Sequence, residues 1–105
     1  MHKLIRDRIP ELIGDAAMFA TIESDALYIE ALFDKLQEEV NELNEARNAQ
    51  NPKSEITYEM CDVLEVLDAI KKFYDIDDRT LTHERKQKAQ LKGVFDKRYI
   101  GFFED

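Results

Sequence analysis

Two segments of the chain carry apolar residues at the repeat of an α-helix. From residue 27 to about 46, and again from about 54 to 74, apolar side chains recur at alternating steps of four and three. The residues in these two stripes are Ile29, Phe33, Leu36, Val40 and Leu43, and then Ile56, Met60, Val63, Leu67, Ile70 and Tyr74. Such steps place the side chains on one face of each helix. We therefore expect two amphipathic helices that pack along these stripes.

The segment between the two helices predicts how they are arranged. Residues 48–54 contain an Asn-Pro pair and are typical of a loop. Asn51 or Ser54 is expected to cap the second helix, and Ser24 is expected to cap the first. A connection this short predicts that the helices form an antiparallel hairpin.

Shorter elements are expected on both sides of the hairpin. Pro10 favours a helical turn near its own position, because proline suits the first turn of a helix. In residues 18–22, Met18, Ala20 and Ile22 alternate with Phe19 and Thr21, which indicates a short extended piece. Residues 80–92 predict a third, more polar helix that ends at Gly93. The tail that follows, from residue 94, is rich in aromatic residues and is expected to need a partner surface.

The predicted fold class is all-α, with the hairpin and the third helix forming a helical bundle. A length of 105 residues predicts a single domain that spans residues 1–105. Leu32, Val66 and Phe73 lie beside the stripes. They suggest that each helix has an apolar face too wide to be covered by the other helix of the hairpin alone. We therefore expect dimerisation to complete the bundle. A rearranged monomer is the alternative.

Composition narrows the classes of function. Fifteen Lys and Arg residues against twenty-three Asp and Glu give a formal net charge of −8, which disfavours binding to nucleic acid or to an anionic membrane. The apolar runs are far shorter than the roughly 20 residues of a membrane span, and the N-terminus shows no signal-peptide core. The single cysteine cannot form an internal disulfide, which predicts a reducing, cytoplasmic location.

Two pairs of carboxylates are candidates for a metal site. Glu39 and Glu42 share one face of the first helix, and Glu59 and Asp62 share one face of the second, because each pair is three residues apart. Each of the four directly precedes a residue of an apolar stripe, so both pairs flank their stripe on the same side. Converging carboxylates repel one another and lose hydration, which a hard divalent cation such as Mg²⁺ relieves.

A solvated acidic face is the alternative to this metal site, since Glu-x-x-Glu is common on helices. The helix face that carries Asp62 continues through Val66, Ala69 and Phe73. These residues are apolar, which indicates that this face is at least half buried. These rows contain no histidine, which disfavours zinc and Glu-x-x-His di-iron sites. The pattern therefore favours magnesium, with Mn²⁺ as an alternative ion.

The same residues form a motif. The sequence EEVNE at residues 38–42, sixteen further residues and EMCD at residues 59–62 resemble the E-E-x-x-E…E-x-x-D signature of the all-α nucleoside triphosphate pyrophosphatase superfamily. Residues 3–10, KLIRDRIP, resemble the opening motif of its MazG-like, or phosphoribosyl-ATP pyrophosphohydrolase-like, branch. Lys88-Ala89, Lys92-Gly93, Phe95 and Arg98 resemble the closing motif of that branch. The resemblance covers nearly the whole chain.

The resemblance implies a Mg²⁺-dependent hydrolase that splits a nucleoside triphosphate, or a related nucleotide, between its α and β phosphates. The products would be a monophosphate and pyrophosphate, and the assembly a homodimer or a dimer of dimers. Glu39, Glu42, Glu59 and Asp62 would be the metal ligands. Glu38 and Glu39 would be the catalytic residues, with Glu38 orienting or deprotonating water. A non-catalytic helical interaction module that keeps the same scaffold is the competing hypothesis.

A bound triphosphate also calls for positive charge. The candidate phosphate-binding residues are Lys3 and Arg6 in the first segment and Lys88 and Lys92 on the third predicted helix. Cations near a helix C-terminus are also favoured by the helix dipole alone, which is the alternative for Lys88 and Lys92. The aromatic residues at helical spacing are expected in the core rather than against a nucleobase, although one of them could stack on a base. They are Tyr28, Phe33, Phe73 and Tyr74.

Overall fold

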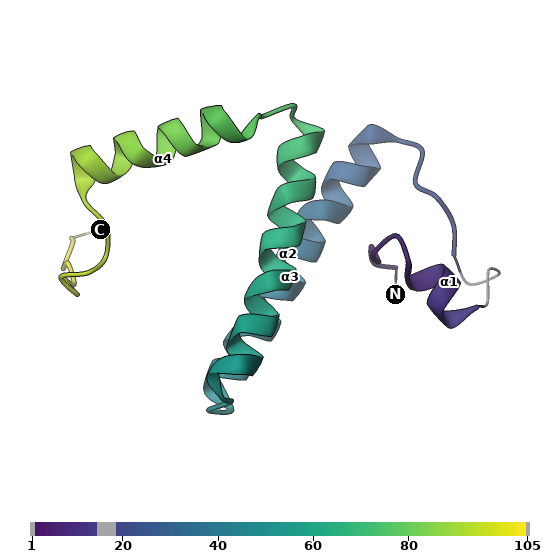
Figure 1. Ribbon diagram of the computed structural model, residues 1–105, viewed down its shortest axis with the longest axis horizontal. Helices are drawn as coiled ribbons and strands as arrows, with labels where there is room; N and C mark the ends of the chain where they lie inside the picture. The colour runs from purple at the N-terminus through teal and green to yellow at the C-terminus, as the bar shows by residue number, and fades with distance from the viewer. Residues whose placement is uncertain (1, 15–18, 105) are drawn as a thin grey trace. The chain divides into compact units, whose positions relative to one another are not determined.

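The computed structural model describes residues 2–14 and 19–104, and the regular structure in these ranges is entirely helical. The helices are α1 (Ile9–Ile13), α2 (Asp25–Asn48), α3 (Lys53–Phe73) and α4 (Asp78–Lys92) (Figure 1). The chain divides into two compact units, Met1–Asp75 and Ile76–Asp105. None of the described helices combines the length and the apolar composition that a membrane span requires. The all-α class and the helical hairpin are confirmed.

The short helix α1 forms where proline predicts it. Pro10 lies in its first turn, and Gly14, at φ 82°, ends it in the left-handed region that glycine adopts without strain. The extended piece expected over residues 18–22 begins at Met18, which lies outside the described residues. Residues 19–22 form no strand.

The hairpin of α2 and α3 is the main element of the first unit. The Ser24 hydroxyl accepts a hydrogen bond from the Leu27 N–H at 3.3 Å, which confirms the predicted cap of α2. Gln50 takes a left-handed conformation at φ 56° and reverses the chain after α2. The residue that caps α3 is Pro52, which makes no side-chain hydrogen bond, so the expectation of Asn51 or Ser54 is wrong. The two long helices run antiparallel, side by side (Figure 1).

The line of contact between α2 and α3 keeps alternate members of the predicted stripes, such as Leu36 and Val63, which are half-buried, and is rotated away from the others. The buried residues of the described chain are Leu32, Glu39, Ala46 and Val66. On α2 they are seven residues apart, and Leu32 and Glu39 each precede a predicted stripe residue by one position. Those stripe residues, Phe33 and Val40, are 51% and 41% exposed. Leu32 and Val66, which the sequence assigned to an uncovered face, are therefore buried in the single chain.

One face of the hairpin is apolar and uncovered in the single chain. The exposed apolar residues that form this apolar face are Phe33 and Val40 on α2 and Met60, Leu64 and Leu67 on α3. Val40 lies two residues before Glu42, and Met60 lies two residues before Asp62, a rotation of about 200° around each helix. Glu39 and Glu59 are about 100° from the same two residues. Since all four acids meet on one side of the hairpin, the apolar face is turned away from them.

The second unit consists of α4 and the C-terminal tail. The Asp77 carboxylate accepts a hydrogen bond from the Thr80 N–H at 2.7 Å, so α4 begins two residues before the predicted start. The same hydrogen bond lowers the pKa of Asp77. Gly93, at φ 81°, ends the helix as predicted. The aromatic side chains of the tail are exposed; they are Phe95, Tyr99, Phe102 and Phe103.

Candidate metal centre

Four carboxylates converge between α2 and α3 and form an acid cluster. Its members are Glu39, Glu42, Glu59 and Asp62. One carboxylate oxygen of each lies within 4.8 Å of those of the other three. Each helix contributes two acids from one face because they are three residues apart, and the antiparallel hairpin brings the two pairs opposite each other. The predicted convergence of these four residues is therefore observed.

Burial leaves part of this negative charge without compensation. Glu39 is only 6% exposed. The Oε2 atoms of Glu39 and Glu59 are buried and have no hydrogen-bond partner among the described residues. A buried carboxylate oxygen without a partner carries a large desolvation cost. The orphaned oxygens and their oxygen-only neighbours are therefore well suited to a hard divalent cation.

Burial and mutual repulsion raise the pKa values of two members of the acid cluster, Glu42 and Glu59. Burial is the main reason that the pKa of Glu42 is raised, and the neighbouring Glu39 raises it further. Burial is also the main reason that the pKa of Glu59 is raised, with the charge of Asp62 as the next cause. Both shifts make ionisation harder than for an isolated carboxyl group, which is the response expected of crowded acids that lack a cation.

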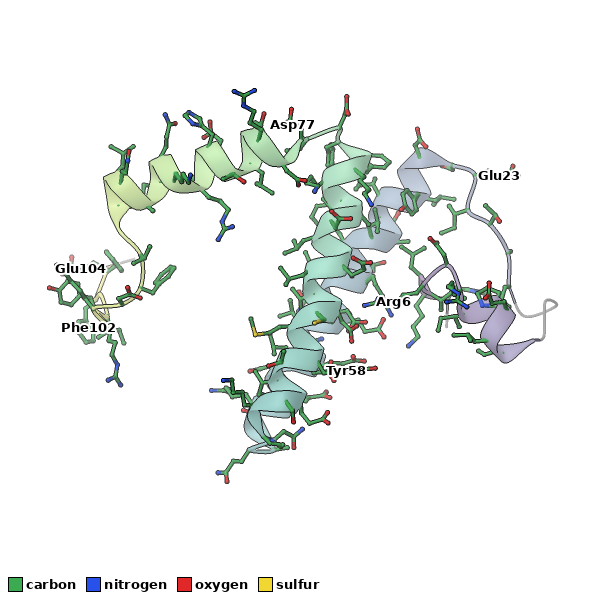
Figure 2. The ribbon with its side chains drawn as sticks, viewed as in Figure 1. Arg6, Glu23, Tyr58, Asp77, Phe102 and Glu104 are labelled. Carbon is green, nitrogen blue, oxygen red and sulfur yellow. The ribbon has the colours of Figure 1, made fainter. Side chains whose placement is uncertain are left out.

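Three cationic side chains reach the acids from outside the cluster. The Arg6 guanidinium donates to Asp62 Oδ1 at 2.7 Å, and its side chain extends from the N-terminal segment toward the hairpin (Figure 2). Lys35 Nζ lies 3.2 Å from Glu39 Oε1. Lys3 Nζ donates to Glu38 Oε1 at 2.8 Å. Of the predicted phosphate-binding residues, Arg6 therefore pairs with a member of the acid cluster and Lys3 with the adjacent Glu38, and their phosphate-binding role stays a prediction.

Sequence reasoning missed Lys35, although a signal for it exists. Lys35 precedes Glu39 by four residues on α2, and side chains at that spacing are neighbours on a helix. Its ammonium group also lies 3.4 Å from Glu38 Oε1. Lys35 thus pairs with both Glu39, a member of the acid cluster, and the adjacent Glu38.

Glu38 stands apart from the acid cluster. The hydrogen bond from Lys3 is the largest cause that lowers its pKa, and the charge of Lys35 acts in the same direction. A carboxylate with a lowered pKa is a weaker base, so this environment favours a role in positioning Lys3 and Lys35 over proton abstraction. The catalytic role of Glu38 stays a prediction.

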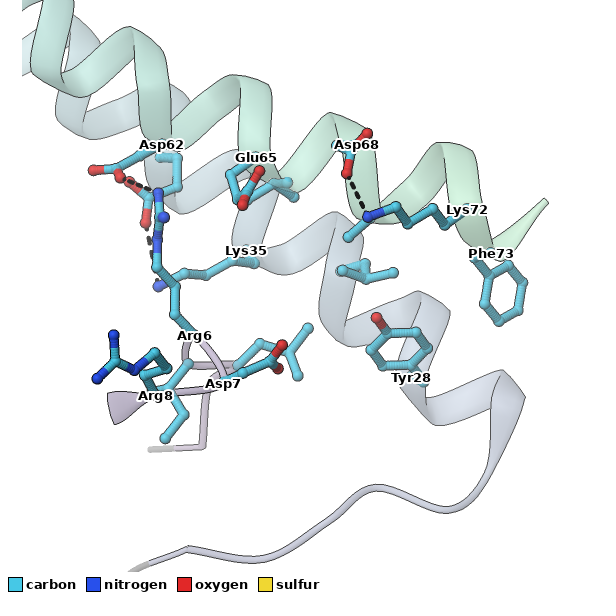
Figure 3. Close-up of a pocket in the computed structure, with 16 residues that line it drawn as sticks. Arg6, Asp7, Arg8, Tyr28, Lys35, Asp62, Glu65, Asp68, Lys72 and Phe73 are labelled. Atoms are coloured by element: carbon cyan, nitrogen blue, oxygen red, sulfur yellow. Dashed lines mark hydrogen bonds and ion pairs between the residues drawn. The ribbon is translucent and has the colours of Figure 1, made fainter. Parts of the chain in front are cut away.

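A groove of about 770 Å³ runs along the hairpin beside the acid cluster. Arg6, Lys35 and Asp62 line one end of it, while Tyr28 and Phe73 line the other (Figure 3). Small-molecule sites in proteins span roughly 300–1,000 Å³, so the groove has the size of a ligand site. The acid cluster therefore opens into a space that can hold a small molecule.

The remaining predicted phosphate-binding residues belong to the second unit. Lys88 lines a groove of about 560 Å³ together with Arg85 and Lys86. Lys92 is the last residue of α4. The phosphate-binding role of Lys88 and Lys92 stays a prediction.

Replacement of Glu59 tests whether the acids are strained. We expect Glu59→Gln to raise the midpoint of thermal unfolding at pH 7 in EDTA, because it removes one charge from a crowded cluster. The pKa of Glu59 is raised in the folded state, so the cost of ionising it is present above that raised pKa. The cost disappears as the pH falls to the ordinary value of 4.5. The gain of the variant should therefore shrink between pH 7 and pH 4.5.

Circular dichroism melts at the two pH values measure this gain. The matched control is Glu65→Gln, which removes a charge from the same helix at an exposed position outside the acid cluster. An equal gain from Glu65→Gln would show that net charge, rather than crowding at the cluster, governs the effect.

The chain has no match among protein-family models, curated proteins or solved structures. The likeness of its motifs to the MazG-like branch therefore stays an expectation. The first unit by itself provides a half-buried cluster with more carboxylates than cations, beside a groove of small-molecule size.

Proposed function

We propose that the protein is a divalent-cation-dependent nucleotide pyrophosphohydrolase of the MazG-like kind. It would cleave the bond between the α and β phosphates of a nucleoside triphosphate or a related nucleotide, releasing a monophosphate and pyrophosphate. The observation that carries the proposal is the convergence of four carboxylates that includes two buried, unpartnered oxygens. Mg²⁺ is the proposed ion because it prefers oxygen ligands, and Mn²⁺ would substitute for it.

The residues of the acid cluster fit such an ion. Glu39, Glu42, Glu59 and Asp62 are all oxygen donors, and two of them hold an oxygen that no described residue satisfies. A bound divalent cation would supply Lewis-acid stabilisation of the charge that develops on phosphoryl oxygens. The protein's own part is to hold the donors on two packed helices, where their positions are fixed before the ligand arrives.

The surrounding cations have the chemistry to bind phosphate. Arg6 and Lys35 each touch a member of the acid cluster and also line the groove. The Arg6 guanidinium has the planar fork that binds two phosphate oxygens at once, and Lys35 offers a point charge. Glu38 would hold Lys3 and Lys35 in place through its ion pairs. Phosphates lying between these groups and the acid cluster would be oriented for attack by water.

The apolar face of the hairpin supports a homodimer as the working assembly. Its five residues, from Phe33 to Leu67, are exposed and apolar in a chain of which 36% is charged. A second copy would cover this face about a two-fold axis and bring four long helices together. A dimer of dimers would need a second surface at which two dimers pack together.

A nucleotide panel tests the proposed activity. With Mg²⁺ or Mn²⁺ present, we expect at least one nucleoside triphosphate to yield pyrophosphate and a monophosphate, and EDTA to stop the reaction. We also expect Mg²⁺ alone to raise the melting temperature, because an ion at 100 times its Kd stabilises the folded state by about 2.7 kcal/mol. Release of orthophosphate alone would contradict the proposed bond cleavage. Absence of both turnover and cation stabilisation would favour a non-catalytic interaction module, to which the apolar face is also suited.

A further inference from the structure

We propose that the Tyr28–Phe73 end of the groove is the nucleobase subsite, an inference that rests on the proposed nucleotide substrate. Tyr28 lies in the first turn of α2 and Phe73 is the last residue of α3. The antiparallel hairpin therefore brings both rings to its open end. Their centroids are 5.9 Å apart and the ring planes are inclined by 52°. The sequence assigned both residues to the core, but the structure places both of them in the lining of the groove.

The lining of the groove changes character from one end to the other. The end beside the acid cluster carries Arg6, Lys35 and Asp62, whereas the rings of Tyr28 and Phe73 lie at the other end (Figure 3). The lining also includes the apolar residues Leu32, Val66 and Ala69. This order suits a ligand with an anionic head and a flat, uncharged end. A nucleotide has this form, since its phosphates are charged and its base stacks on aromatic rings.

Polar groups at the aromatic end favour a base over an aliphatic chain. The Tyr28 hydroxyl has no hydrogen-bond partner within residues 2–14 and 19–104, so it is available to the polar edge of a base. Lys72 and Asp68 also line this part of the groove and pair with each other at 2.9 Å. An aliphatic tail would leave these groups poorly solvated without contacting them usefully.

The aromatic end is held in place before a ligand arrives. The Phe73 ring packs against Tyr28 on one side and makes an edge contact with Tyr74, whose ring centroid is 5.1 Å away. Phe73 is therefore held between Tyr28, at the start of α2, and Tyr74, directly after the end of α3. A braced ring loses little side-chain entropy when a base stacks on it.

Binding to variants of the two rings tests the subsite. Tyr28→Leu and Phe73→Leu should each weaken binding of a nucleoside triphosphate analogue with an α,β-methylene bridge, in the presence of Mg²⁺, by about ten- to hundredfold. This is the range that loss of one stacked base costs. Binding of inorganic tripolyphosphate with Mg²⁺ should stay unchanged, because it has no base. The matched control is Tyr58→Leu, which removes an exposed ring of α3 that does not line the groove.

A second measurement uses the unaltered protein and needs no metal. Free nucleosides at millimolar concentration should shift the ring NMR signals of Tyr28 and Phe73, but not those of Tyr58. If these shifts occur while tripolyphosphate fails to bind with Mg²⁺, the base subsite stands and the proposed metal chemistry fails. If no nucleoside shifts either ring, or if the variants weaken tripolyphosphate and nucleotide binding equally, the subsite is wrong.

Discussion

Glu39→Gln is expected to reduce pyrophosphate release by more than about 100-fold and to remove stabilisation by Mg²⁺. Glu39 is the most buried member of the acid cluster and carries one of its two unpartnered oxygens. Loss of a group that merely supports a metal ligand typically costs 10–100-fold in affinity or activity. Loss of a proposed ligand itself should therefore cost more. Pyrophosphate release under saturating nucleotide, and melting curves with and without Mg²⁺, measure the two effects.

A neighbouring acid provides the control for this variant. Glu45→Gln changes an exposed carboxylate on the same helix, outside the acid cluster, and should leave both readouts at the level of the unaltered protein. Glu39→Gln should still fold in EDTA, because relief of the crowded charge offsets the lost ion pair with Lys35, and its circular dichroism spectrum checks this. Wild-type turnover by a folded Glu39→Gln variant would rule out the acid cluster as the active centre.

The double variant Met60→Glu with Leu64→Glu is expected to convert the proposed dimer to a monomer. Both side chains belong to the apolar face and are 49% and 61% exposed in the single chain. Full burial of one such side chain contributes roughly 1.5–3 kcal/mol, and about half of that is gained when a half-exposed side chain is covered. A two-fold dimer loses four such contributions, so association weakens by at least about 100-fold. In a two-fold assembly the new charges would also be added to both copies of the interface. Sedimentation velocity over a range of protein concentrations measures the change.

Leu91→Glu serves as the control for this interface. Leu91 is 84% exposed on α4 and does not belong to the apolar face, so its replacement should leave the sedimentation coefficient unchanged. A monomeric unaltered protein at high micromolar concentration would contradict the proposed dimer. So would a double variant that still sediments as a dimer.

The long helices could be predicted because their signals are local. Steps of three and four mark α2 and α3, and the side chain of Ser24 and the backbone freedom of Gly93 mark helix ends. On α2 the predicted stripe holds at the half-buried Leu36 and Leu43, but it takes Val40 where the structure buries Glu39. The reason is Glu39, which a hydrophobic pattern treats as a surface residue. Glu39 meets the acids of α3 across the hairpin, and no pattern within α2 contains that contact.

The acid cluster could be predicted because both of its pairs sit in the same register beside their stripes. The cations around it were harder to place. Lys3 and Glu38 are 35 residues apart in sequence, and Arg6 and Asp62 are 56 apart. Contacts over such distances leave no periodic signal, because they depend on how an irregular N-terminal segment packs against the hairpin. The groove and its aromatic end were missed for the same reason, since they form only when the ends of α2 and α3 meet.

The turn between α2 and α3 limits how the sequence around the acid cluster can change in length. Helix α2 continues for six residues after Glu42, and α3 runs for six residues before Glu59. The two acid pairs meet because these arms are equally long, so that each pair stands the same number of 1.5 Å steps from the turn. Lengthening one arm by a residue would slide the pairs apart and swing one of them through about 100°. Distant relatives should therefore be recognised by matched arm lengths, even where the residues within the arms differ.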